Sequence, residues 1–420
     1  MEQRRVFAKA GWRLIPFMML LYVGNFLDRV NVGFAALSMN KDLGIGAEAF
    51  GFAGGIFFLG YFFFEVPSNL ILEKVGARLW IFRIMLTWGA VSMATAFVQG
   101  LPSLLLLRFL LGVAEAGFFP GIIFYLGLWF PSAVRARFVG LFLCSISLAN
   151  IVGAPLSGFI LGMDGVRGLH GWQWLFLLEG IPSVVLAFSV LVWLPNGPED
   201  ARWMTPDEKA VIRSQLAAEP PHKHNELWPM LRDPRVWALA IPDFGIVLST
   251  YGVGLWLPQI VKSLGFSNLG TGFAVAAVYV LSSVVSILWC LSSDRASERI
   301  RHVSAAVLLG AAGLIAAAFT QGTIFCVFAL AVGMSGTLAA ISVFWALPSG
   351  FLGSTAAAGG IALINSLANL GGFAGPYLMG WLKVASGGYT LGLCALAAGL
   401  VMTASLILLL GRGFTRQPVQ

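Results

Sequence analysis

The sequence is poor in charge. Only 11% of its 420 residues are charged, whereas 58% are hydrophobic. A soluble domain of ordinary composition carries about a quarter charged residues, so this composition excludes a water-soluble globule. Cysteine is also scarce. The four cysteines lie in apolar stretches without the spacing of a metal or redox motif, so we interpret them as packing residues and expect no disulfide framework: Cys144, Cys290, Cys326 and Cys394.

The chain also lacks the motifs of a motor or of a metal site. No G-x-x-x-x-G-K-[ST] phosphate-binding loop occurs, so ATP hydrolysis is not expected to supply energy and a gradient must do so. His222 and His224 are close together in a polar stretch but have no further candidate ligands. We therefore predict no metal, no cofactor and no enzymatic activity.

Long apolar runs dominate what is present. Runs of about 20 or more residues are long enough to cross a hydrocarbon core of roughly 30 Å as helices, and they do not alternate as barrel strands would. The predicted fold is an all-α integral membrane protein with twelve transmembrane helices in two six-helix, pseudo-repeated bundles. The predicted spans are residues 14–37, 49–72, 79–99, 103–130, 136–162, 172–194, 235–261, 271–292, 302–320, 323–348, 356–383 and 388–411.

One long polar stretch divides the chain. It is rich in proline and mixed charge, and we predict a first bundle over residues 1–194, a cytoplasmic linker over 195–234 and a second bundle over 235–420. Thr205 followed by Pro206, Asp207 and Glu208 favours the start of a short surface helix that runs to about Ala218. The first apolar run is too long for a cleavable signal and is interpreted as the first span.

The net charge of +7 follows the membrane topology. With a cytoplasmic N-terminus, 20 of the 26 Lys and Arg residues fall on cytoplasmic segments and four outside, as the positive-inside rule requires. We therefore expect lipid rather than nucleic acid as the surrounding partner, and a multi-pass protein of the inner (plasma) membrane with both termini in the cytoplasm. A monomer is expected.

The two halves resemble each other. A Leu-Ala-Asn triplet precedes a proline in spans five and eleven, and a tryptophan precedes a proline near the ends of spans four and ten. Six plus six spans around a linker are typical of transporters that work by alternating access and bind substrate between the halves. The matched residues are Leu148-Ala149-Asn150 with Pro155 and Leu367-Ala368-Asn369 with Pro376, and Trp129 with Pro131 and Trp345 with Pro348.

Seven charged residues fall inside predicted spans, where each costs roughly 2.5 to 3.5 kcal/mol at the helix centre. Such residues usually face a cavity or one another. Arg108 and Glu115 are two helical turns apart on one face, with Asp28 expected at an intermediate depth. Arg108 could neutralise either carboxylate or an incoming anion, and a carboxylate released from its arginine takes up a proton more readily in a dry site. The seven are Asp28, Arg29, Glu65, Arg108, Glu115, Glu179 and Asp243.

Other interpretations of these residues remain open. Arg108 and Glu115 could form an ion pair that only joins helices. We interpret Glu65 as structural, and Glu179 as a side chain that satisfies backbone near the bend at Pro182. Asp243 is a third titrating group, a substrate contact or the cap of a helix break. Three further polar or aromatic side chains either line a cavity or make ordinary helix contacts: Tyr61, Trp345 and Asn365.

Several motifs together resemble those of the anion:cation symporter family within the major facilitator superfamily. Residues 25–31 (NFLDRVN) resemble its opening motif, and 108–112 with 115–117 its span-four motif. Residues 344–348 (FWALP) and 359–366 (GGIALINS) resemble motifs of the branch of this family that includes tartrate and phthalate permeases. The loops after spans two and eight match through residues 65–70, 74–78 and 293–295.

The resemblance implies proton-coupled uptake of a small organic anion, such as a tartrate-, phthalate- or aromatic-acid-like carboxylate. It implies that Arg29 and Tyr61 contact the anion, that Asp28 and Glu115 take protons and that Arg108 couples them. From the second half it implies three lining residues, Ser342, Trp345 and Asn365. Asp243 stands where sugar-acid members tend to carry an amide, which argues against a sugar-acid substrate.

Two alternatives have different functions. Residues 153–158 (GAPLSG) resemble part of the span-five motif of proton antiporters that export drugs or metabolites. A membrane receptor that senses the anion without moving it is a second alternative, against which the absence of an output domain argues.

Overall fold

The computed structural model describes residues 2–218 and 232–414, and within them the side chains except those of residues 2, 349–359, 362 and 412–414. His222 and His224 therefore lie outside the described residues. Every regular element of the described chain is helical. The first half contains α1 (Glu2–Asp42), α2 (Ala47–Val75), α3 (Ala77–Ala94), α4 (Leu101–Glu115), α5 (Phe118–Gly127), α6 (Ser132–Ile160) and α7 (Gly171–Trp193).

The second half follows the linker helix α8 (Pro206–Ala217). Its helices are α10 (Pro234–Lys262), α11 (Asn268–Ala296), α12 (Ile300–Phe319), α13 (Phe325–Phe344), α14 (Leu347–Ser386) and α15 (Thr390–Phe414). Within the described residues, eleven helical segments are long and apolar enough to span a membrane, α4 and α5 together forming one of them. The 40-residue α14 is the twelfth long helix. The predicted all-α membrane fold is confirmed.

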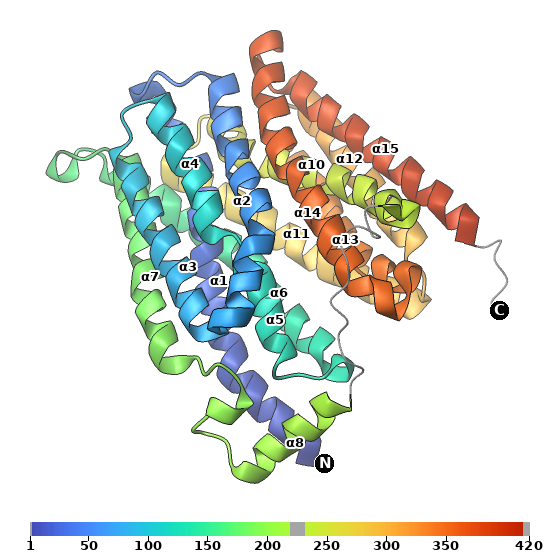
Figure 1. Ribbon diagram of the computed structural model, residues 1–420. Coiled ribbons are helices and arrows are strands. Elements are labelled where there is room, and N and C mark those ends of the chain that lie inside the picture. Colours follow the sequence, from blue (N-terminus) through green and yellow to red (C-terminus); the bar gives the residue numbers. More distant parts are fainter. Residues whose placement is uncertain (1, 219–231, 415–420) are drawn as a thin grey trace.

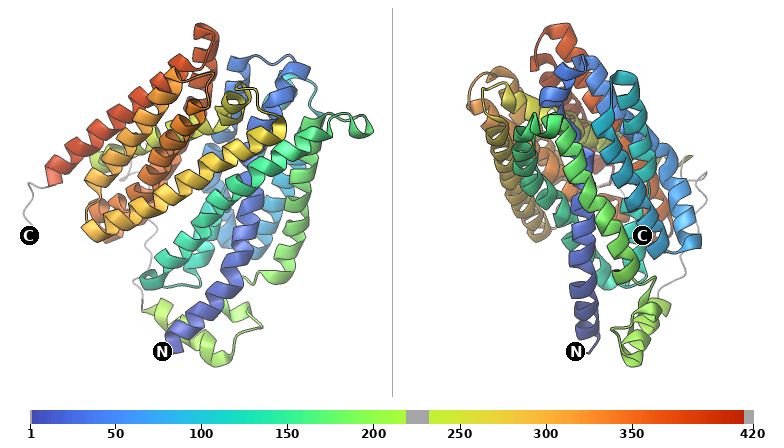
Figure 2. Two further views of the ribbon diagram at one scale, coloured as in Figure 1. Left: turned by 180° about the vertical axis from the view of Figure 1, so that it is seen from behind. Right: turned by 90° about the vertical axis from the view of Figure 1, so that its left-hand side faces the viewer.

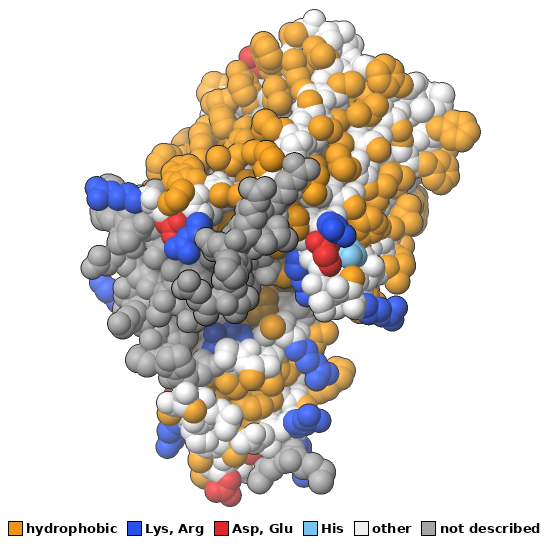
Figure 3. All heavy atoms as spheres, turned by 90° about the vertical axis from the view of Figure 1, so that its right-hand side faces the viewer, with side chains coloured by type: hydrophobic (Ala, Val, Ile, Leu, Met, Phe, Trp, Pro, Cys, Tyr) orange, Lys and Arg blue, Asp and Glu red, His pale blue; other side chains and the backbone are white. Residues whose placement is uncertain are grey.

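The helices of each half pack together into a bundle, and the two bundles lie side by side (Figure 1). The N-terminus and α8 lie at one end, which we call the linker end, and we call the opposite end the far end. α8 begins at the predicted start, with a capping box in which the Thr205 and Glu208 side chains accept hydrogen bonds from each other's backbone N–H groups. On the face in Figure 3, hydrophobic side chains cover the upper part and the Lys and Arg side chains lie below it.

Glycines bring the bundles into backbone contact toward the far end. A Cβ added at Gly158 of α6 would lie 2.5 Å from the carbonyl oxygen of Asn268 in α11, and one at Gly51 of α2 would lie 2.5 Å from that of Pro376 in α14. Only glycine allows helices to approach this closely. Away from these contacts the bundles diverge toward the linker end (Figure 2).

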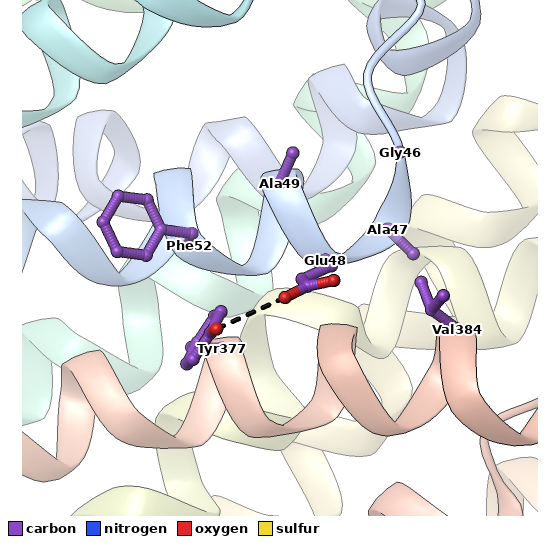
Figure 4. Close-up of a pocket in the computed structure, with 7 residues that line it drawn as sticks. All are labelled: Gly46, Ala47, Glu48, Ala49, Phe52, Tyr377 and Val384. Atoms are coloured by element: carbon purple, nitrogen blue, oxygen red, sulfur yellow. Dashed lines mark hydrogen bonds between the residues drawn. The ribbon is translucent and has the colours of Figure 1, made fainter.

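A side-chain bond adds to the contact at the far end. The Tyr377 hydroxyl of α14 donates to Oε1 of Glu48 in the first turn of α2, at 3.3 Å. The two side chains point toward each other across a small hollow of about 460 Å³ between these helices (Figure 4). The far end is therefore held shut by polar as well as backbone contacts.

Two of the predicted spans contain a helix break. Span four is divided, because α4 ends at Glu115 and α5 begins at Phe118, with Gly117 between them at φ +87°. Span ten was predicted to reach residue 348, but α13 ends at Phe344 and a new helix starts at Leu347. Hydropathy does not mark either break, because both lie within predominantly apolar runs.

Candidate substrate and proton site

An ion pair between α1 and α4 is the centre of the site. Nε of Arg29 donates to Oε1 of Glu115 at 2.8 Å, and Nη2 donates to the same oxygen. Glu115 is fully buried, Arg29 keeps 10% of its side chain exposed, and Oε2 of Glu115 has no hydrogen-bond partner among the described residues. Because Glu115 is the last residue of α4, its carboxylate lies at the helix break.

Aromatic rings enclose the Arg29 guanidinium. Its Cζ lies 5.2 Å from the ring centre of Phe57 and 5.4 Å from that of Tyr61, within the range of cation–π attraction. Nη1 donates to the hydroxyl of Tyr251 in α10, at 3.3 Å. The predicted contact residue Tyr61 thus lies beside Arg29, and Tyr251 links the pair to the second bundle.

Arg108 is buried without a carboxylate partner among the described residues. Nε lies 3.4 Å from the carbonyl oxygen of Ala53 and Nη2 lies 3.5 Å from that of Gly54, both long for hydrogen bonds, and Nη1 has no partner in the described chain. The ion pair of Arg108 with Glu115, one of the interpretations left open by the sequence, does not form among the described residues. Two helical turns separate the residues by about 10 Å along one helix, and Arg29 approaches Glu115 from another.

Asp28 lies in a separate polar cluster inside the first bundle. Its carboxylate is fully buried and accepts hydrogen bonds from Ser92 at 2.5 Å, Ser183 at 2.7 Å and Trp88 at 3.1 Å. These donors come from α3 and α7. These three neutral donors surround the carboxylate, and Asp28 forms no ion pair in the described structure, so Arg108 is not its partner here.

Glu65 joins the two bundles. It is buried in α2, and its carboxylate accepts from Nδ2 of Asn365 at 3.3 Å and from Oγ of Ser366 at 3.0 Å, both in α14. The predicted lining residue Asn365 is therefore held by a carboxylate of the other half. The interpretation of Glu65 as structural overlooked this contact between bundles.

Ser342 and Trp345 lie near the linker end of α13. The Ser342 hydroxyl donates to the carbonyl of Leu338 at 2.7 Å and shares a hydrogen bond with Ser286. Trp345 packs edge-on against Phe344. In the described structure neither residue forms a hydrogen bond, ion pair or ring contact with Arg29 or with the residues around it, so the role of Ser342 and Trp345 at the site stays a prediction.

Neither Asp243 nor Glu179 forms a hydrogen bond or ion pair with Arg29 in the described structure. Asp243 is fully buried and neither carboxylate oxygen has a hydrogen-bond partner among the described residues. It caps no helix break, because α10 is continuous from Pro234 to Lys262. Glu179 accepts a hydrogen bond from the Ser157 hydroxyl of α6 at 2.7 Å, so it bonds a side chain rather than the backbone near Pro182.

Sequence reasoning missed Tyr251. The only signal was a hydroxyl-bearing ring in the apolar α10, one of seven tyrosines in the chain. The described residues contain no group of three or more His, Cys, Asp or Glu side chains placed to hold a metal ion. The Arg29–Glu115 ion pair is suited to exchange of Glu115 for another anion at Arg29. Glu115 is fully buried, whereas 10% of the Arg29 side chain remains exposed.

The profile of the Major Facilitator Superfamily matches residues 18–376. The chain belongs to this superfamily. A "Putative tartrate transporter" of Agrobacterium vitis is 48% identical over 413 residues, covering 98% of this chain and 92% of that protein. A "Quinolone resistance transporter" of Acinetobacter baumannii is 41% identical over 411 residues, covering 97% and 94% of the two chains.

A solved structure supports the same fold. The crystal structure of a bacterial homologue of the human lysosomal transporter Spinster, in an inward-facing and unoccupied conformation, superposes with a TM-score of 0.80 at 16% identity. The match covers 100% of this chain and 98% of that one. The superfamily member described here is therefore a multi-pass membrane transporter and not an enzyme.

Proposed function

We propose that this transporter takes up a small organic anion together with protons by alternating access between two bundles, residues 1–194 and 235–420, joined by a cytoplasmic linker over 195–234. The proposed substrate is a tartrate-, phthalate- or aromatic-acid-like carboxylate. The tartrate-transporter relative supports this substrate class. The Arg29–Glu115 ion pair carries the proposal.

The pair works as an exchange. A substrate carboxylate can bind the planar guanidinium of Arg29, whose N–H groups donate two parallel hydrogen bonds to the two carboxylate oxygens. Glu115 then loses its counter-charge in a buried position, where an unpaired negative charge is costly, so it binds a proton. Substrate and proton thus enter the site together, and release of the anion restores the ion pair.

Arg108 supplies a second positive charge near the proposed site, while Arg29 remains the residue that binds the substrate carboxylate. Its guanidinium lies 5.2 Å from the Phe57 ring, and the Arg29 guanidinium lies 5.2 Å from the same ring. An anion bound at Arg29 is therefore attracted by Arg108 as well, which favours a dicarboxylate. Tyr61, Ser342, Trp345 and Asn365 are proposed to line the site, with Asp28 as a further proton carrier and Asp243 as a contact in the second bundle.

Two cross-bundle links couple binding to movement. Tyr251 bonds Arg29, and Glu65 bonds Asn365 and Ser366. Substrate that takes Arg29 weakens the first link. With the far end closed by glycine packing, the site is approached from the linker end, where the basic residues cluster. We infer a cytoplasm-facing conformation of a monomer in the inner membrane, with both termini in the cytoplasm.

Export by proton antiport is the second candidate. The quinolone-resistance relative and the GAPLSG motif favour it. In the structure Gly153 of this motif packs against the side chain of Leu27, beside Asp28 in α1. A receptor that binds the anion without moving it is the third candidate. No feature of the described residues favours it over transport.

Transport by the full chain in cells tests the three candidates. Uptake of labelled tartrate, phthalate and benzoate is measured at acidic and neutral external pH, with and without a protonophore. Symport predicts uptake of at least one acid that is fastest in acid and abolished by the protonophore. Uptake that survives collapse of the proton gradient contradicts the proposal. Efflux driven by outside acid identifies an exporter, and binding without accumulation identifies a receptor.

A further inference from the structure

A large basic pocket lies at the linker end, apart from the Arg29 site. It has a volume of about 1550 Å³ and is lined by the first part of α1, the end of α7, the start of α3 and the segment that leads to α8. None of the proposed transport residues lines it. The transport mechanism therefore does not account for this pocket.

Three arginines line the pocket and make it cationic. They are Arg13 from α1, Arg78 from α3 and Arg202 from the segment before α8, against one acidic lining residue, Asp200. None of the three arginines forms an ion pair with another residue of the described chain. Nε of Arg78 is buried with no hydrogen-bond partner among the described residues. The pocket thus offers unused donors for an anion.

Exposed aromatic and aliphatic side chains adjoin these arginines. Trp12 is 83% exposed and Trp193 69% exposed, and both line the pocket together with Leu20 and Val192. Tryptophan is enriched where helices cross from the headgroup region to the acyl chains. The pocket therefore presents a cationic part, from α1, α3 and the segment before α8, beside an apolar part from α1 and α7.

We propose that this pocket binds an anionic phospholipid. Its phosphate lies among Arg13, Arg78 and Arg202, and its acyl chains lie along the apolar residues of α1 and α7. Arginine forks bond phosphate oxygens in pairs, and basic pockets at the cytoplasmic ends of helices suit anionic headgroups. A small soluble anion would use the arginines alone, whereas a phospholipid contacts the arginines and the adjoining apolar side chains with one molecule.

Lipid binding by the full-length protein tests the proposal. Purified protein in detergent is titrated with fluorescent phosphatidylglycerol, and then with fluorescent phosphatidylcholine of the same acyl length. The triple variant Arg13→Gln, Arg78→Gln, Arg202→Gln removes the cationic part. Its matched control removes three exposed arginines of the same membrane end, Arg137→Gln, Arg295→Gln and Arg301→Gln, none of which lines the pocket.

The expected result is tight phosphatidylglycerol binding that falls more than about tenfold in the pocket variant and less than about threefold in the control, with weak phosphatidylcholine binding throughout. Equal losses in the two variants overturn the proposal, as does full displacement of the lipid by millimolar inorganic phosphate. The single variant Arg202→Gln, at an exposed position, repeats the test if the triple variant does not fold. Unchanged binding in that folded variant and in Arg13→Gln also overturns it.

Discussion

Arg29 links the elements of the proposed site through three kinds of contact. It forms an ion pair with Glu115, lies against the Phe57 and Tyr61 rings, and donates to Tyr251 across the two bundles. Removing its guanidinium removes all three contacts at once. For this reason Arg29 is the residue whose loss should affect substrate binding most.

Arg29→Ala should weaken substrate binding by about tenfold to a hundredfold, because a charge-assisted bond contributes roughly 1.5 to 3 kcal/mol. Equilibrium binding of labelled substrate to purified protein measures this effect. Arg167→Ala, at an exposed position toward the far end, is the control and should bind as the unaltered protein does. Unchanged affinity of Arg29→Ala would remove Arg29 from the substrate site.

Glu115→Gln should separate exchange from accumulation. Glutamine resembles a protonated glutamate but cannot release a proton, so substrate counterflow should persist while uptake driven by a proton gradient should collapse. Both are measured on one reconstituted preparation and normalised to folded protein. A purely structural ion pair predicts instead that Arg29 is left unpaired, which destabilises the protein by roughly 3 to 5 kcal/mol and lowers its amount. Loss of counterflow together with uptake argues against the proton-carrier role.

Sequence reasoning selected the charged residues of the candidate site but not their partners. Asp28, Arg29 and Glu115 stood out because charge is expensive within an apolar span. Their contacts depend on how α1, α3, α4 and α7 pack, and no spacing within one helix contains that information. Tyr251 escaped notice for the same reason, since a tyrosine in a membrane helix has several ordinary roles.

At the level of elements, α8 is joined to α1 by one exposed ion pair. Nζ of Lys9 donates to both carboxylate oxygens of Glu208, at 2.7 and 2.8 Å. This hydrogen bond lowers the pKa of Glu208 from its ordinary value of 4.5. A lowered folded pKa means that the contact stabilises docking above 4.5 and that this contribution is lost as the pH falls through the folded pKa.

The contact of α8 with α1 should therefore be complete at pH 7 and loosen in acid below about pH 4.5. Spin labels at Ala8 and Ser214 should report one narrow distance at neutral pH and a broader distribution in acid. Lys9→Ala should broaden it already at pH 7, while Lys209→Ala, which removes a charge from α8 itself, should not. The same narrow distance in Lys9→Ala would show that the ion pair does not hold α8.

Close glycine packing should determine whether the far end can close. In Gly158→Leu the added side chain meets the backbone of α11, so the bundles should separate there. Spin labels at Lys41 and Ser263 should then move apart by several ångströms. Gly162→Leu is the control, because a Cβ at that position meets nothing within 4 Å. Equal distances in both variants would contradict the role given to this contact.

Element boundaries were predictable only where chemistry marks them. Thr205 followed by Pro206, Asp207 and Glu208 predicted the start of α8, which runs from Pro206 to Ala217. The division of span four went unpredicted, because Gly117 is one of 50 glycines and most of these serve close packing. The extension of α1 back to Glu2 was missed as well, since hydropathy marks membrane depth and not where a helix begins.

For the whole molecule, the order of spans and the two-bundle fold follow from apolar runs and the polar linker. The divergence of the bundles toward the linker end does not follow from them. Under the proposed alternating access, one sequence forms both the open and the closed arrangement, so the pattern of spans does not favour either. Contacts such as that of Glu65 with Ser366 distinguish the arrangements, and they join residues about 300 positions apart in the chain.

Direct measurement of proton movement driven by substrate tests proton-coupled anion uptake most closely. The protein is reconstituted into liposomes that enclose a pH-sensitive dye, without an imposed pH gradient, and a carboxylate that cells accumulate is added outside. Symport predicts that the lumen acidifies as the anion enters, and that liposomes containing Glu115→Gln show no such change. Anion entry without acidification, or a lumen that becomes alkaline, would contradict the account.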